Sequence, residues 1–148
     1  MRKILIISLL FLVSCTAEMP SDNYTPIPTT FVGKDLEFFN ELNQMRLSRN
    51  LPPLKAEKKL KEGCIQHSTY MFSLDSLNHD YFYSRYMNSN TKGFAEVVCY
   101  GYNTSLSQIS AYESSVSHNQ VLINPIFTHV GIANVGLYQT VNLGYYAK

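Results

Sequence analysis

Two histidines and one glutamate have the side-chain types of a metal site. His79, Glu96 and His118 lie 17 and 22 residues apart, in three separate segments of the chain. Two imidazoles and one carboxylate can hold a divalent ion and leave a coordination position open, as in catalytic zinc sites. Spacing this wide does not establish contact, so a second interpretation stays open. In that interpretation Glu96 is a buried acceptor for His79 and a neighbouring backbone N–H, with a structural role.

The other histidines are weaker candidates. His67 follows Cys64 by three residues on an apolar helical stripe, where a packed structural role is expected. His129 falls in a β-rich run, where side chains alternate between the two faces. The sequence has no HExxH, no GxSxG and no glycine-rich phosphate loop, so the standard hydrolase signatures are missing.

Residues 1–15, MRKILIISLLFLVSC, have the form of a lipoprotein leader. A basic pair precedes an apolar run over residues 4–13, and Ser14 and Cys15 follow. The run is about half of the ~20 residues that a membrane-spanning helix needs. We therefore predict a signal peptide over residues 1–14 and a lipid on Cys15. An ordinary signal peptide that happens to contain a cysteine is the alternative.

The charge balance argues against a nucleic-acid partner. Removal of residues 1–14 leaves ten basic and eleven acidic residues, whereas nucleic-acid binding requires a basic stripe. From Val97 to Ala147 the only charged residue is Glu113. This half of the chain is expected to supply a buried sheet and a neutral, hydrogen-bonding exterior.

Residues 16–33 are rich in Pro, Thr and Ser and are predicted to form a flexible tether. Residues 34–148 are long enough for one domain with its own core. Hydrophobic spacing predicts helices over 35–50, 56–73, 81–87 and 105–117, an extended segment over 94–102, and a hairpin of strands 127–138 and 139–147. Helices followed by a terminal hairpin favour an α+β domain. Its core candidates include Ile132, Val135, Val141 and Leu143.

Cys64 and Cys99 leave two alternatives open. An exported chain can oxidise a pair of cysteines to a disulfide. The two thiols can equally be buried as small apolar groups.

An ordered set of motifs runs through the domain: NELNQMRLSRNLPPL, CIQHSTYM, LNH, an arginine at position 85, GFAE and AYESSVSHNQVLINPIFTHVGI. The set resembles the bacterial branch of the CAP superfamily, which comprises cysteine-rich secretory, antigen 5 and pathogenesis-related 1 proteins and whose module is also called the SCP domain. The resemblance covers nearly everything after the tether. It implies a CAP-type α-β-α sandwich, with helices packed on both faces of a small antiparallel β-sheet.

The resemblance also implies a polar cavity, which family members line with two histidines and two acidic residues. His79, Glu96 and His118 match three of these positions, and the position of the second acid falls on Ser115. In some relatives the histidine pair holds a metal ion, so His79 and His118 are the candidate zinc ligands, although no cofactor is required. Arg85 matches a family arginine, and we expect it to form a structural salt bridge.

Two positions depart from the family pattern. Val97 stands where an asparagine usually follows the glutamate, and Tyr112 replaces the usual tryptophan. These departures, together with the missing second acid, weaken an enzymatic interpretation.

The leader and the CAP-like domain together are similar to surface lipoproteins of spirochaetes. We therefore expect a lipid-anchored protein of the bacterial outer membrane, located at the cell surface, that serves as a non-enzymatic binding or interaction module. Its expected partners are the membrane, through Cys15, and a host protein, sterol or fatty acid. A metal-dependent hydrolase or protease that uses the His/Glu cavity is the alternative, and a purely structural envelope protein is a third.

Overall fold

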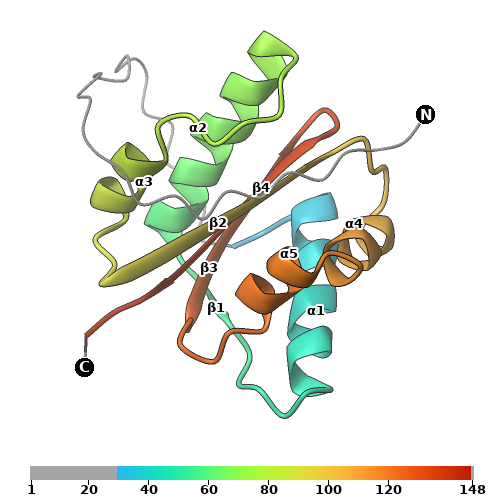
Figure 1. Ribbon diagram of the computed structural model, residues 1–148, viewed down its shortest axis with the longest axis vertical. Helices are drawn as coiled ribbons and strands as arrows, with labels where there is room; N and C mark the ends of the chain where they lie inside the picture. Colours follow the sequence, from blue (N-terminus) through green and yellow to red (C-terminus); the bar gives the residue numbers. More distant parts are fainter. Residues whose placement is uncertain (1–29, 148) are drawn as a thin grey trace.

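The computed structural model describes residues 30–147, which form five helices and four strands (Figure 1). In chain order these elements are α1 (Gly33–Leu47), β1 (Lys55–Ala56), α2 (Lys58–Leu74), α3 (Phe82–Ser89), β2 (Gly93–Tyr100), α4 (Ser105–Glu113), α5 (Val116–Leu122), β3 (His129–Val135) and β4 (Tyr138–Tyr145). The predicted signal peptide, Cys15 and most of the predicted tether lie outside the described residues.

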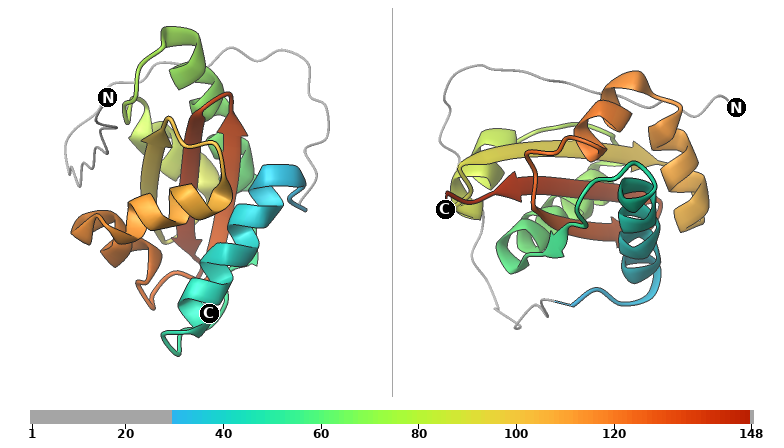
Figure 2. Two further views of the ribbon diagram at one scale, coloured as in Figure 1. Left: turned by 90° about the vertical axis from the view of Figure 1, so that its right-hand side faces the viewer. Right: turned by 90° about the horizontal axis from the view of Figure 1, so that it is seen from below.

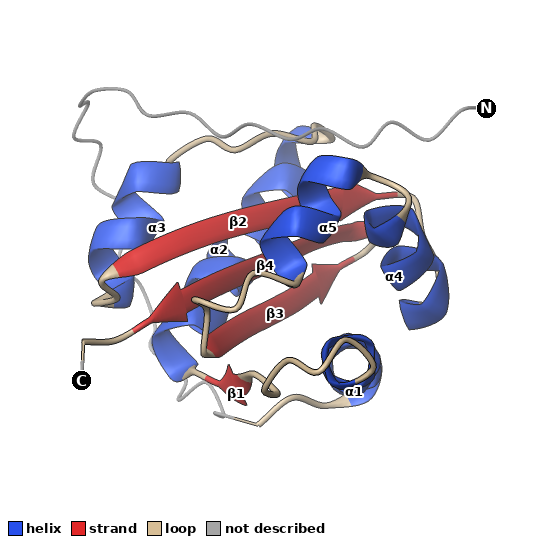
Figure 3. Cartoon of the chain, turned by 60° about the horizontal axis from the view of Figure 1, so that its bottom comes forward, coloured by secondary structure: helices blue, strands red, loops and turns tan. Residues whose placement is uncertain are grey.

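The sheet has the order β1-β3-β4-β2 (Figure 3). Its three long strands are antiparallel, and β4 lies between β3 and β2. The predicted hairpin is confirmed. Its strands are shorter than predicted because Gly136, with a φ of +58°, starts the turn. The two-residue β1 was not predicted; it pairs parallel with β3 at the edge of the sheet.

Helices cover both faces of the sheet, which confirms the predicted α-β-α layering (Figure 2). Helices α1, α4 and α5 pack on one face, around a core that includes Phe38, Tyr112 and Leu122. Ile132, Val141 and Leu143 point into this core, whereas Val135 is half-buried. Helices α2 and α3 lie on the other face (Figures 1 and 2).

The two faces of the sheet differ in polarity because side chains alternate along each strand. Ala95, Val97 and Cys99 of β2 belong to the apolar core under α1, α4 and α5. Glu96 points the other way, toward α2 and α3, and its cross-strand neighbour is Asn142. The α2 face of the sheet therefore contains a buried polar layer.

The start of the domain corrects the predicted tether. Phe31 is buried in the core and its ring lies 5.0 Å from that of Phe39. Residues 30–33 therefore belong to the folded domain, because the large apolar surface of Phe31 is removed from water there.

The predicted helix over 105–117 is two helices. Helix α4 ends at Glu113, and α5 begins at Val116 with Ser115 as its N-cap. The helix is interrupted at Ser114 and Ser115. Ser114 Oγ competes for a backbone acceptor and donates to Ser110 O at 2.7 Å, and Ser115 takes an extended backbone conformation. His118 consequently lies inside α5 and not near the end of a longer helix.

The two cysteines are buried free thiols. Cys64 belongs to α2, whereas Cys99 points into the core on the opposite face of the sheet. Burial raises the pKa of Cys99 to about 12, which keeps this thiol protonated and unreactive. Of the two alternatives, the structure therefore shows buried thiols.

Among residues 30–147, no helix has the length and apolarity that crossing a membrane requires.

Gly131 of β3 permits the close approach of α2 to the sheet. A Cβ at this position would lie 2.1 Å from the backbone carbon of Leu60 and 2.3 Å from the nitrogen of Lys61. We expect Gly131→Ala to lower the free energy of unfolding by about 3 kcal/mol, because backbone atoms cannot move aside as a flexible side chain can.

Gly63→Ala is the matched control for this measurement by thermal or urea unfolding. Its Cβ would meet side-chain atoms, with Asn142 Nδ2 at 3.1 Å. Alanine also has the higher helix propensity, so we expect a change within about 1 kcal/mol. Equal stability of Gly131→Ala and the wild type would contradict the proposed packing constraint.

Candidate functional site

The Glu96 carboxylate is the centre of a buried charged cluster. Both its oxygens bind Arg85 of α3: Nε donates to Oε2 at 2.6 Å and Nη2 donates to Oε1 at 2.6 Å. The side chain of Glu96 is fully buried, and that of Arg85 is nearly so. This bidentate pair confirms the salt bridge that we expected for Arg85, and its geometry is the strongest available to an arginine and a carboxylate.

His79 is the second partner of Glu96. It lies in the connection between α2 and α3, and its Nδ1–H donates to Glu96 Oε1 at 2.9 Å. A carboxylate can only accept this bond, so the neutral ring carries its proton on Nδ1. The other nitrogen, Nε2, is buried and has no hydrogen-bond partner within the described part of the chain.

His67 of α2 is a third partner, which the sequence placed on a packed stripe without a link to Glu96. Its Nε2–H donates to the carbonyl of Asn78 at 2.8 Å and lies 3.7 Å from Glu96 Oε1. The helical spacing from Cys64 and Met71 predicts its burial, but only the fold brings β2 beneath it. A signal was present in the motif CIQHSTYM, which the family resemblance already included.

The cluster lowers the pKa of both Glu96 and His67, for different reasons. Burial alone raises the pKa of Glu96, but the hydrogen bond from His79 and the charge and hydrogen bonds of Arg85 outweigh it, and the pKa is about 2. Burial lowers the pKa of His67 to about 4, although Glu96 acts against this change. At neutral pH the cluster therefore combines an ionised carboxylate, a guanidinium and a neutral His67.

His118 and Ser115 form a second pair, at the junction of α4 and α5. His118 is fully buried, its Nδ1 lies 2.7 Å from Ser115 Oγ, and its ring packs 5.3 Å from that of Tyr112. The contact spans one helical turn, as expected for residues three apart. The four predicted cavity residues thus form two pairs, His79 with Glu96 and His118 with Ser115. A single cavity shared by all four stays a prediction.

Arg46 fixes the segment that follows α5, a role that the sequence did not reveal. Its guanidinium is buried and donates to the carbonyl of Leu122 at 2.7 Å and to those of Asn124 and Phe127 at 3.2 Å each. It also donates to Pro52 O at 3.1 Å. These bonds hold the end of the helix that carries His118 against α1.

His129 lies in β3, outside both pairs. Its Nδ1 is 2.8 Å from Thr128 Oγ1, and its ring packs at 4.9 Å from that of Tyr146. Burial and the nearby Lys55 lower its pKa.

Removing one partner of the ion pair should destabilise the protein more than removing both. Arg85→Met leaves the Glu96 charge buried without its guanidinium, so we expect a loss of about 3–5 kcal/mol in the free energy of unfolding. The double variant Arg85→Met, Glu96→Leu should recover most of this loss. A double variant as unstable as the sum of the two single variants would contradict the coupling.

The stability should fall as the pH decreases from 6.5 toward 4. In this range an unfolded histidine with the ordinary pKa of 6.5 takes up a proton, whereas folded His67 with a pKa of about 4 does not. The difference corresponds to about 3 kcal/mol that is fully present above pH 6.5 and lost by about pH 4.

Urea unfolding at several pH values measures this effect, with His67→Gln as the comparison. The variant should show a flatter pH dependence above pH 4.5. Glu96 does not interfere there, because its stabilising contribution declines only between pH 4.5 and about 2. Parallel curves for the variant and the wild type would rule out His67 as the titrating group.

Three solved structures with the same fold are bacterial proteins. An extracellular SCP-domain protein of Bacillus anthracis matches with a TM-score of 0.72 and 20% identity over 76% of this chain and 40% of that one. A cysteine-rich secretory protein of Staphylococcus aureus matches with a TM-score of 0.69 and 19% identity, over 75% of this chain and 38% of that one. This chain thus spans less than half the length of these two proteins.

The third structure is an outer surface protein of Borrelia burgdorferi, with a TM-score of 0.67 and 18% identity over 74% of this chain and 90% of that one. At these identities the similarity establishes the fold alone. Among curated proteins, none matches the sequence.

The family assignment comes from the sequence itself. The model of the cysteine-rich secretory protein family, CAP, matches residues 39–146. This range takes in α2 to β4 and most of α1, including His79, Glu96 and His118. The match covers most of the chain and agrees with the fold of the solved structures, so this chain belongs to the cysteine-rich secretory protein (CAP) family.

Proposed function

We propose that this chain is a lipid-anchored protein of the bacterial outer membrane, exposed at the cell surface, whose CAP domain binds a partner and is not an enzyme. The leader over residues 1–15 supports the lipid anchor. The similarity to the outer surface protein of Borrelia burgdorferi supports the location, since the match covers 90% of that protein.

The hydrogen bonds that Glu96 accepts are the observation that favours binding over catalysis. Both carboxylate oxygens are held by Arg85 in a buried pair, and one of them also accepts from His79. A general base works best with a pKa near the operating pH. The pKa of Glu96 is about 2, so this carboxylate is a weak base at neutral pH.

The partner that we propose is a host protein or a lipid such as a sterol or fatty acid. The second half of the chain keeps several large apolar side chains exposed, namely Tyr100, Leu106, Val116, Ile126 and Leu137. Exposed apolar surface with few charges suits such partners. Saturable binding of cholesterol or palmitate would identify the lipid class, and its absence for both would favour a protein partner.

A metal-dependent hydrolase is the second candidate, because of the orientation of His79. Its Nδ1–H donates to a carboxylate while the buried Nε2 has no partner among residues 30–147, as in metal-ligating histidines before the metal binds. Zinc would then supply an activated water. In residues 30–147, however, no three His, Cys, Asp or Glu side chains are grouped so as to hold a metal ion. The described residues therefore lack the three-ligand set of a catalytic zinc site, and an ion shared by His79 and His118 alone stays a prediction.

We expect radiolabelled palmitate to enter the wild-type protein and to be absent from Cys15→Ala. The thiol of Cys15 is the proposed attachment point, and alanine cannot be acylated. Protease treatment of intact cells should then degrade the wild-type protein. Equal labelling of the variant would refute the anchor, and full protection in intact cells with digestion after lysis would refute the surface location.

Titration calorimetry with zinc separates the two functions. For a binding module we expect the same weak response from the wild type, His79→Ala and His118→Ala. A zinc site on these histidines would instead give binding that both variants lose. That binding would strengthen as the pH rises through the histidine range, because only neutral imidazole coordinates the ion. This second result would favour the hydrolase.

A further inference from the structure

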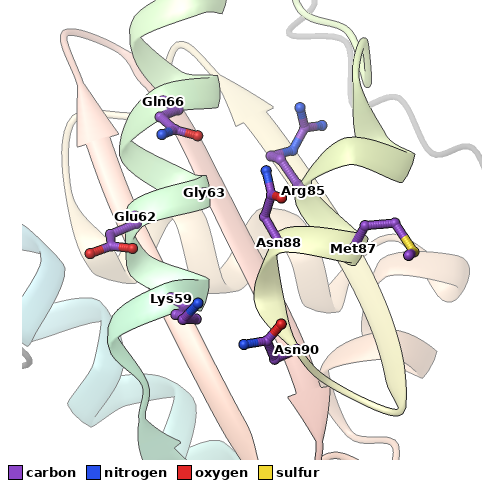
Figure 4. A pocket seen from close by; sticks show the side chains of 8 residues that line it. All are labelled: Lys59, Glu62, Gly63, Gln66, Arg85, Met87, Asn88 and Asn90. Carbon is purple, nitrogen blue, oxygen red and sulfur yellow. The ribbon is translucent and has the colours of Figure 1, made fainter. Parts of the chain in front are cut away.

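A polar pocket lies between α2 and α3, on the outer side of the buried Glu96 cluster. Its volume is about 300 Å³. Its walls come from two helices and from the residue that ends α3: Lys59, Glu62, Gln66, Met87, Asn88 and Asn90 (Figure 4). This size lies at the lower end of the range for small-molecule sites.

The polar groups of the pocket are available for a ligand. Lys59, Gln66, Asn88 and Asn90 are exposed, and within residues 30–147 no hydrogen bond or ion pair uses their side chains. In Figure 4, Asn88 and Asn90 project from the α3 side toward α2. Each side-chain amide offers donors and an acceptor together.

The floor of the pocket is rigid. Gly63 of α2 packs closely there, since a Cβ on it would lie 3.1 Å from Asn142 Nδ2 and 3.6 Å from Arg85 Cδ. The guanidinium of Arg85 is turned toward Glu96 and held by two hydrogen bonds to it. The stem of Arg85 is therefore fixed, and the floor of the pocket is preorganised.

The charges of the pocket favour a neutral ligand. One wall carries a cation, Lys59, and an anion, Glu62, whose carboxylate also lies 3.9 Å from Lys58 outside the pocket. The carboxylate in the wall repels a phosphate or a polyanion. Three amides with mixed donor and acceptor capacity match hydroxyl groups, which also donate and accept.

Met87 of the pocket wall and Tyr83, one helical turn before it on α3, offer apolar and aromatic surface next to the pocket. Tyr83 is 62% exposed and Met87 56% exposed. Tyr83 contacts Tyr86, whose ring in turn stacks on Phe94 at 5.8 Å, so this surface is supported from below. Aromatic and thioether groups of this kind can pack against the C–H faces of a sugar ring.

We propose that the pocket between α2 and α3 binds a neutral sugar, with the amides of Gln66, Asn88 and Asn90 contacting its hydroxyls and Tyr83 and Met87 contacting its apolar edge. A peptide fits less well, because peptide recognition uses an extended sheet edge or a long groove. This inference goes beyond the proposed function, and it depends on neither the lipid anchor nor the histidines.

Saturation-transfer difference NMR tests the proposal on the full chain in a detergent without a sugar headgroup. The probes are the methyl glycosides of glucose, galactose and N-acetylglucosamine, and a blocked alanine dipeptide is the competing probe. We expect saturable binding of at least one glycoside in the millimolar range. Asn88→Leu and Gln66→Leu should each weaken it roughly fivefold, since each removes hydrogen bonds to the ligand.

Asn40→Leu is the matched control, because it makes the same change at an exposed position of α1 and should bind like the wild type. Thermal unfolding checks that every variant is folded. If one of the two pocket variants does not fold, the other alone is enough for the test. Three results would overturn the proposal: no saturable signal from any glycoside, unchanged affinity in a folded pocket variant, or saturable binding of the dipeptide alone. None of them would affect the palmitate labelling of Cys15.

Discussion

The Glu96 carboxylate is fully buried between the sheet and helices α2 and α3, where an isolated charge is strongly unfavourable. Its burial is tolerated because Arg85 and His79 bind it and His67 lies within 3.7 Å, and these residues come from α3, the α2–α3 connection and α2. The whole α2–α3 side of the molecule thus converges on one strand position. Any rearrangement of that layer would expose or unpair the carboxylate, so the interaction fixes where α3 and its connection lie.

The opposite side of the sheet is organised by a second buried charge with different partners. Arg46 binds only backbone carbonyl oxygens among the described residues, and these follow α5 or belong to the loop after α1. A guanidinium suits this task because its donors lie in a fixed plane and point in several directions. One face of the sheet therefore matches a cation with an anion, and the other matches a cation with peptide dipoles. Arg46 thereby holds the irregular segments after α1 and α5, whereas Arg85 joins α3 to strand β2.

Hydrophobic periodicity predicted the elements that bury one continuous face. The helix over 56–73 and the terminal hairpin agree with α2, β3 and β4 to within a few residues, because Leu60, Cys64, Met71, Ile132 and Val141 make the pattern unambiguous. The break at Ser114 and Ser115 was not predicted, since either serine is also compatible with a continuous helix. Strand β1 has only two residues and no pattern of its own.

The candidate site, too, was predicted only in part. The contact of Glu96 with His79 was one of the two interpretations that the residue types left open, and the family motifs led us to expect a salt bridge of Arg85 without naming its partner. To predict the contact of His67 with Glu96, one would need to know the register of β2 under α2. The backbone oxygens that accept from Arg46 lie 6 to 81 residues away along the chain. Long-range contacts of this kind leave no local signal in the sequence.

The position of β4 also determines when the domain can form. This strand is the last of the described elements, yet it is central in the sheet and pairs with both β2 and β3. A chain without β4 has no strand between β2 and β3, so the three long strands can pair only after β4 has been synthesised. Until then β2 and β3 each have an unpaired edge, and an unpaired strand edge is a site where another chain can add a strand.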